Sequence, residues 1–205
     1  MNFDFSAGAL RACRLQLEPA DSSAEAKSHI IWKSAVLLGK LAAHKHYFTD
    51  YTRGCAGECQ GFCRDLSAGC RIVKHRVVAA LLEKNALCWE VWRGPGNVDF
   101  CGILRLSEVE PGCTAKAHYM FFDGRLKDKT PLLLEWKRWV RDTLSLRRIT
   151  IEVPANAFAL ARHAVQYLDF GGPYLYRGLP VEGAMIGAKV LDGKELDIMI
   201  LGCKL

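Results

Sequence analysis

The sequence predicts an α+β protein with a mixed, mostly antiparallel sheet flanked by helices. Apolar residues alternate with period two in several short runs after Ala86, which is typical of strands. Elsewhere they recur at spacings of three and four, which is typical of helices packed by one face. The order of these runs also points to one sheet, because an antiparallel meander is followed by a strand, a helix and another strand.

Two helices are predicted in the N-terminal third. After a short strand around Arg14 to Leu17, the run from Ala24 to Leu41 places its apolar residues on one helical face. A polar segment follows, and a second, shorter helix is marked by Val77, Val78, Leu81 and Leu82.

A hairpin and a third strand come next. LCWEVW and VDFCGILRL alternate apolar and polar residues, and Pro95 and Gly96 between them supply the reversal. A loop at EVEPGC then leads to the strand AHYMFF.

A crossover follows this meander. The helix from about Pro131 to Leu144 is expected to bury a stripe made of Leu133, Trp136, Val140 and Leu144. The strand RRITIEV comes directly after it. A strand, a helix and a strand in this order normally form a right-handed crossover. We therefore expect AHYMFF and RRITIEV to be adjacent parallel strands.

The C-terminal part predicts one more helix and a hairpin. In PANAFALARHAVQYLDFGG, Asn156 is expected to cap the helix start by accepting an amide proton, and Gly171 and Gly172 to end the helix. Two strand-like runs, GAMIGAKVL and LDIMILGCKL, then meet at the Asp192-Gly193 turn.

Length and charge narrow the functional classes. A chain of 205 residues that is half apolar can bury one core, so we expect a single domain over residues 1–205, with a cysteine-rich insertion at about 50–72. The formal charge of +6 favours anionic partners, namely phosphorylated cofactors, acidic proteins or nucleic acid. Nucleic acid is the least supported, because the basic residues form only scattered pairs.

The location of the protein is also predicted from composition. The opening MNFDFSAGAL is not a basic start followed by an apolar run, and no segment approaches the roughly 18 apolar residues that span a bilayer. We therefore expect a cytoplasmic protein without a membrane span, or one packaged in a virion assembled in the cytoplasm.

Nine cysteines without a secretory signal indicate thiols or metal ligands rather than disulfides. Cys88 and Cys101 lie in strand-like runs and are expected to be small buried apolar residues. The segment RGCAGECQGFCRDLSAGC spaces its cysteines by three, three and six residues, unlike the usual zinc-binding pairs. We expect these four to be reduced and metal-free, with a metal site as the alternative: Cys55, Cys59, Cys63 and Cys70.

The stretch RRITIEVPANAFALARHAVQYLDFGG resembles the GNAT superfamily of acyl-CoA-dependent N-acyltransferases. That family has a strand ending in a hydrophobic-x-Val sequence, then an Asn, then a helix ending in a Leu-Gly-Phe-like triplet. The matching residues are Ile151-Glu152-Val153, Asn156 and Leu168-Asp169-Phe170. The resemblance covers about Ala86 to the C-terminus.

The resemblance implies a site for acetyl-CoA between AHYMFF and RRITIEV. Backbone groups of the first strand would bind the pantetheine arm, and the start of the following helix would hold the diphosphate. The implied cofactor-binding residues are Met120, Phe121, Phe122, Arg125, Lys127, Lys129 and Asn156.

The sequence departs from the family pattern at two places. The loop motif, an Arg or Gln followed by x-x-Gly-x-Gly or Ala, falls near Arg125 to Thr130, where Lys127, Asp128 and Lys129 replace the glycines. Aligning the C-terminal triplet also puts Val165 where the family commonly has a Tyr that protonates the leaving thiolate.

Three residues are candidates for the base that would deprotonate an acceptor amine. His118 begins the strand AHYMFF and has an ordinary pKa near neutrality. Glu90 and Glu108 lie on or beside the hairpin. Each of the three has an alternative interpretation as a solvated or half-exposed strand residue.

Two functions are consistent with this pattern. One is a divergent, non-catalytic GNAT-like protein with a binding or structural role and a protein partner or homo-oligomeric state. It would be similar to phage-encoded GNAT-like proteins with poor phosphate loops, some of them virion-associated. The other is an active acetyl-CoA-dependent N-acetyltransferase. We favour the first, because a working enzyme would need replacements for both departures.

Overall fold

The computed structural model describes residues 4–14, 86–96, 99–123, 128–191 and 194–205. The chain divides into two compact units, and residues 1–15, 85–186 and 197–205 belong to the first. The site described below lies in that unit. The helices expected between residues 24 and 82 and the cysteine-rich segment fall outside the described residues.

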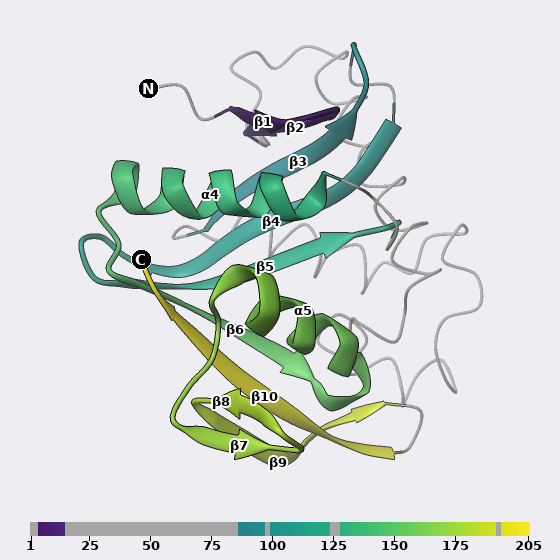
Figure 1. Cartoon of the computed structure of the whole chain (residues 1–205), viewed down its shortest axis with the longest axis vertical. Helices are drawn as coiled ribbons and strands as arrows, with labels where there is room; N and C mark the ends of the chain where they lie inside the picture. The colour runs from purple at the N-terminus through teal and green to yellow at the C-terminus, as the bar shows by residue number, and fades with distance from the viewer. Residues whose placement is uncertain (1–3, 15–85, 97–98, 124–127, 192–193) are drawn as a thin grey trace, which may run out of the picture. The chain divides into compact units, whose positions relative to one another are not determined.

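The first unit is built around a mixed sheet (Figure 1). In the described residues this sheet has eight strands, in the order β1-β2-β3-β4-β5-β6-β10-β9, and residues 187–196 of β9 and β10 belong to the second unit. The strands are β1 (Phe5–Ala7), β2 (Leu10–Arg14), β3 (Leu87–Arg93), β4 (Asp99–Glu110), β5 (Thr114–Phe121), β6 (Arg148–Pro154), β9 (Gly183–Leu191) and β10 (Lys194–Lys204). β5 and β6 pair in parallel, whereas β1–β2, β2–β3, β3–β4, β4–β5 and β6–β10 are antiparallel pairs. The predicted α+β class is confirmed.

The crossover is also confirmed. Helix α4 (Lys129–Leu144) connects β5 to β6, and these strands are parallel neighbours as expected. The helix begins two residues before Pro131. Three residues of its predicted stripe are buried, namely Leu133, Trp136 and Val140, whereas Leu144 is half-buried.

Helix α5 (Phe158–Leu168) differs from the prediction at both ends. Ala157 occupies its N-cap position without a side-chain hydrogen bond, and Asn156 lies in a preceding 3₁₀ turn, η2 (Ala155–Ala157). Asn156 therefore does not occupy the N-cap position predicted for it. The helix ends at Leu168, and its C-cap is Asp169 with φ +57° rather than Gly171 or Gly172. The left-handed conformation reverses the chain there without glycine.

Several strand boundaries also differ from those predicted from the sequence. Of the first predicted strand only Arg14 lies in the described residues, where it ends β2, and β2 is paired with β1, which the pattern did not reveal. The first half of the expected loop EVEPGC is strand, because β4 continues to Glu110 through an irregularity between Ser107 and Glu110, and only residues 111–113 form the turn. A two-stranded hairpin, β7 (Tyr174–Tyr176) and β8 (Leu179–Val181), was missed.

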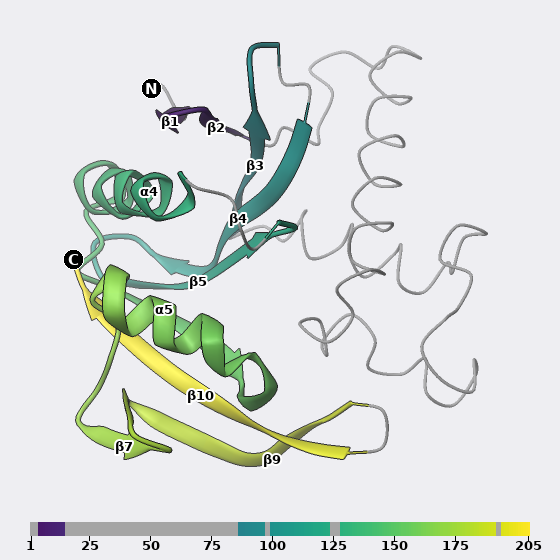
Figure 2. The same ribbon diagram turned by 45° about the vertical axis from the view of Figure 1, so that its right-hand side comes forward.

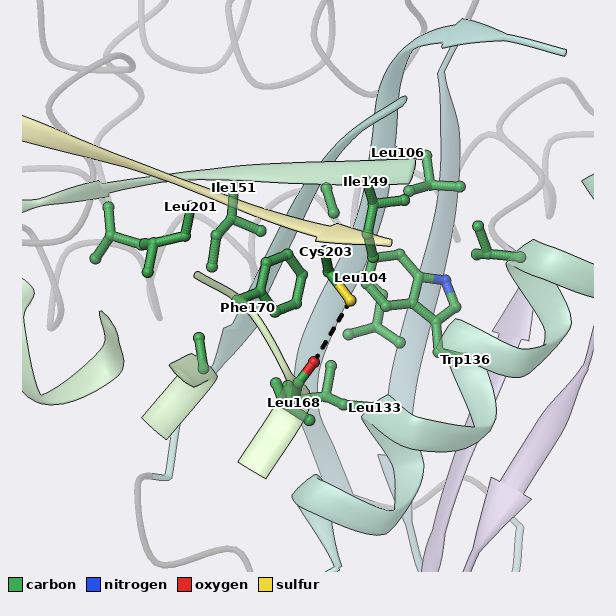
Figure 3. Close-up of a cluster of buried hydrophobic side chains, with 14 of the residues drawn as sticks. Leu104, Leu106, Leu133, Trp136, Ile149, Ile151, Leu168, Phe170, Leu201 and Cys203 are labelled. Carbon is green, nitrogen blue, oxygen red and sulfur yellow. Dashed lines mark hydrogen bonds between the residues drawn. The ribbon is translucent and has the colours of Figure 1, made fainter. Parts of the chain in front are cut away.

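Helices α4 and α5 cover the same face of the sheet (Figures 1 and 2). Strand residues that face them alternate with residues on the other side, and together with both helices they form one core (Figure 3). Within it, the Cys203 thiol donates a hydrogen bond to the Leu168 carbonyl at 3.7 Å. Cys88 and Cys101 are buried, as predicted. No helix among the described residues is long and apolar enough to span a membrane.

Candidate functional site

The parallel pairing of β5 with β6 stops early. Its ladder comprises three pairs, from Thr114–Arg148 to Lys116–Thr150. Beyond Lys116, β5 continues to Phe121 while pairing with β4 on its other side, and the two parallel strands separate (Figure 1). The β6-facing backbone of this part of β5 therefore lies beyond the ladder and is suited to bind an extended ligand.

The predicted pantetheine-binding residues lie along this separated part. Met120 and Phe121 are half-buried beyond the last ladder pair. Phe122 is buried, and its N–H donates to the Cys101 carbonyl at 2.9 Å. The Phe122 amide is therefore used within the fold, and the assignment of Met120, Phe121 and Phe122 to the pantetheine arm stays a prediction.

The start of α4 differs from a glycine-lined anion site. Asp128 occupies the N-cap position, but its side chain makes no capping bond to its own helix. Instead it accepts a hydrogen bond from the Ala9 N–H at 3.0 Å, in the turn between β1 and β2. A carboxylate therefore stands where the family motif has its first glycine.

The same helix turn offers few amides to an anion. Pro131 has no N–H, and the Leu132 N–H donates to the Asp128 carbonyl at 3.0 Å. The two helix amides that precede Pro131 are those of Lys129 and Thr130. Lys129 lies in this first turn as the resemblance implies, whereas Arg125 and Lys127 lie outside the described residues.

His163 of α5 lies beside this turn, which the sequence pattern did not reveal. Its Nε2 shares a 2.9 Å hydrogen bond with the Thr130 hydroxyl. Burial and the nearby charge of Lys129 lower the pKa of His163. The spacing of 33 residues between Thr130 and His163 carries no local signal, so only the packing of α4 against α5 shows the contact.

His118 is an unsuitable base in this environment. Its Nε2 hydrogen-bonds the Ser107 hydroxyl at 3.0 Å across the β4–β5 pair. Burial, together with the charges of Arg105 and Lys116, lowers the pKa of His118 to about 4. The imidazole is therefore neutral at pH 7 but binds protons weakly.

Glu108 has a different environment from the one expected. It is a non-glycine residue with φ +51° and lies at the irregularity in β4. Its exposed carboxylate contacts Lys116 Nζ at 2.9 Å, and the same ammonium lies 3.0 Å from Glu152 of β6. Burial lowers the pKa of Lys116, but the hydrogen bonds to both carboxylates raise it overall. Lys116 thus holds Glu108 in an ion pair.

Glu90 is not part of the same group. It is buried on β3, and its carboxylate accepts a hydrogen bond from Trp92 Nε1 at 3.3 Å. β4 lies between β3 and β5 in the sheet. The structure therefore brings His118 close to Ser107, Lys116 and Glu108, and leaves Glu90 apart.

The α5 side of the site carries no polar group at the expected position. Asp169, the middle residue of the predicted triplet Leu168-Asp169-Phe170, adopts the left-handed conformation. Val165, at the position of the family's Tyr, packs against the core. Tyr167 is 52% exposed, and its ring lies 5.2 Å from that of His163.

No metal-binding group of three or more His, Cys, Asp or Glu residues occurs in the described part of the chain. The weak metal candidates Cys55, Cys59, Cys63 and Cys70 lie outside it.

Comparisons with known proteins support the fold. No family model and no curated protein matches the chain. Among solved structures, it is similar to a probable GNAT-family acetyltransferase from Chromobacterium violaceum, with TM-score 0.67, 13% identity and coverage of 100% of this chain and 87% of the other. It is also similar to RimL, a ribosomal-protein alpha-N-acetyltransferase in complex with coenzyme A, with TM-score 0.62, 16% identity and coverage of 96% and 94%.

A third similar structure is a dodecameric spermidine N-acetyltransferase from Vibrio cholerae, with TM-score 0.58, 10% identity and coverage of 96% and 94%. These identities are low, so the likeness shows the fold. The chain has the GNAT fold that the sequence predicted.

Proposed function

We propose that this GNAT-fold chain binds the pantetheine portion of acyl-CoA and serves as a binding or structural protein without efficient acyl transfer. One observation carries the non-catalytic part: His118 Nε2 is hydrogen-bonded to the Ser107 hydroxyl at 3.0 Å, in a position where burial lowers the pKa of His118 to about 4. An acceptor ammonium such as that of lysine has a pKa of about 10. General bases work best with a pKa near the operating pH, so this imidazole would give little assistance.

Binding of the pantetheine arm is supported by the early end of the β5–β6 ladder at Lys116–Thr150. The diphosphate end of acyl-CoA fits less well. The Asp128 carboxylate repels an anion at the start of α4, and Pro131 removes one of the N–H groups that could bind it. The proposed ligand therefore binds mainly through its pantetheine arm.

The test compares two ligands and one reaction. Isothermal titration with acetyl-CoA and with acetyl-pantetheine should give saturable binding, with dissociation constants within about tenfold of each other. Incubation with acetyl-CoA and a panel of primary amines should give no acetylated product by mass spectrometry. Absence of saturable binding would refute the ligand, and repeated turnover would refute the non-catalytic role.

The second candidate is an active acetyl-CoA-dependent N-acetyltransferase. The separation of β5 and β6 favours it, together with Lys129 in the first turn of α4, which could bind phosphate as a point charge. Under this function, Lys127→Ala with Lys129→Ala should abolish acetyl transfer and weaken CoA binding. The same pair of changes should leave acetyl-pantetheine binding nearly unchanged.

The binding or structural role would involve a protein partner, a second copy of the chain, or a phage particle. Light scattering after size-exclusion chromatography measures the oligomeric state. Purification of particles from infected cells, followed by mass spectrometry, tests virion association. A monomer found only in the soluble fraction would contradict this extension of the proposal.

A further inference from the structure

The separated part of β5 carries one polar side chain on the face covered by the helices. Tyr119 alternates with Lys116, His118 and Met120, whose side chains lie on the other face, and it packs against the core. It lies opposite Leu104 of β4 and three residues beyond the last pair with β6. Its side chain is therefore on the α4 and α5 side of the place where the parallel strands separate.

The hydroxyl group of Tyr119 is buried and has no hydrogen-bond partner in the structure of the described residues. Burial also raises the pKa of the phenol well above its ordinary value. The group is therefore a neutral hydrogen-bond donor throughout the physiological range. A buried polar group without a partner is uncommon in a folded protein and calls for an explanation, since leaving it unsatisfied is costly.

The neighbouring helix does not supply a partner. Val165 stands where the family commonly places a Tyr, and its side chain is apolar and packs into the core. Val165 of α5 and the Tyr119 hydroxyl of β5 thus lie on the same side of the sheet.

We propose that the Tyr119 hydroxyl donates a hydrogen bond to an acceptor on the pantetheine thioester that binds between β5 and β6. The acceptor is an amide carbonyl of pantetheine or the thioester group. This inference rests on the proposed binding function and assigns it a specific residue on the strand. Tyr119 is here a ligand-binding residue, and no step of acyl transfer depends on it.

Tyr119→Phe tests the proposal, because it removes one oxygen and keeps the shape of the ring. Titration with acetyl-pantetheine and with acetyl-CoA should show affinity reduced about three- to tenfold, the loss of one neutral hydrogen bond. The melting temperature of the ligand-free variant should equal or exceed that of the wild type, since a buried donor without a partner has been removed. Tyr174→Phe is the matched control, because Tyr174 is 64% exposed on β7, and it should change neither quantity.

The outcomes separate the two proposals. If the wild type binds neither ligand, the proposed function fails and this inference fails with it. If the wild type binds and Tyr119→Phe binds equally well, only the assignment of Tyr119 is overturned. A melting temperature several degrees lower for ligand-free Tyr119→Phe would also overturn it, because the hydroxyl would then have a partner within the protein.

Discussion

The carboxylate of Asp128 accepts a hydrogen bond from the backbone N–H of Ala9 at 3.0 Å, across 119 residues of sequence. The contact joins the turn between β1 and β2 to the first turn of α4. It gives Asp128 a role in the fold at a position where the GNAT loop motif has glycine.

Replacing Asp128 should therefore affect stability and ligand binding in opposite directions. Asp128→Ala should lower the free energy of unfolding by about 1 kcal/mol, the usual contribution of one such hydrogen bond. It should also strengthen acetyl-CoA binding, because a negative charge leaves the start of α4, while acetyl-pantetheine binding should not change. Denaturant unfolding and titration measure the two effects. Asp142→Ala is the control, because Asp142 is exposed and lies near the other end of α4. It should change neither the free energy of unfolding nor the affinity for acetyl-CoA.

Gly8 lies against the same carboxylate. Its φ is +56°, and a Cβ there would lie 2.5 Å from the Asp128 carboxyl carbon. Gly8→Ala should cost at least about 2 kcal/mol in unfolding free energy, because a clash is added to backbone strain. At Gly94, with φ +81° and no atom within 4 Å of such a Cβ, Gly94→Ala measures strain alone and should cost about 1 kcal/mol.

A double variant separates these causes. If Asp128 is the obstacle, the Gly8→Ala change should cost about as much as Gly94→Ala when it is made in the Asp128→Ala background. Equal costs for Gly8→Ala and Gly94→Ala in the wild-type background would contradict the clash.

His118 should make stability depend on pH. Its folded pKa of about 4 lies below the ordinary 6.5, so the unfolded chain binds more protons between these values. The free energy of unfolding should therefore rise between about pH 4 and pH 6.5, and His118 should contribute at most about 1.4 kcal/mol per pH unit to this rise. Above pH 6.5 the contribution of His118 should be fully present and no longer change with pH. Urea unfolding at several pH values measures the slope. His118→Gln should reduce the slope, and an unchanged slope would contradict the burial of His118.

His163 requires its own variant in this experiment. Its pKa is also lowered, so it contributes in the same direction. His163→Gln in the same pH series isolates its contribution from that of His118.

The two ion pairs of Lys116 should differ in strength. The side chains of Lys116 and Glu152 are 24% and 27% exposed, whereas that of Glu108 is 64% exposed. Water screens the exposed pair more, so a double-mutant cycle of Lys116→Ala with Glu108→Ala should give a coupling of less than about 0.5 kcal/mol. The cycle with Glu152→Ala should give about 1 kcal/mol. The reverse order would show that Glu108 is the principal partner.

The sequence alone determined the sheet class and the order of the elements it shares with the structure. Period-two runs located β3 to β6, and helical spacing located α4 and α5, because these patterns depend only on which face of an element is buried. The parallel pairing of β5 and β6 followed from the strand, helix and strand order. The sequence alone also showed that Asp128 lies in the loop where the resemblance to GNAT proteins implies glycines.

The tertiary structure decided which side chains meet and how they titrate. Asp128 with Ala9, Thr130 with His163, and Lys116 with Glu152 are all contacts between distant segments, and periodicity does not encode them. The pKa of His118 depends on burial and on the charges beside it, which the residue type does not carry. That the Tyr119 hydroxyl has no hydrogen-bond partner in the described part of the chain likewise became visible only from the structure, because hydrogen bonding is a property of geometry.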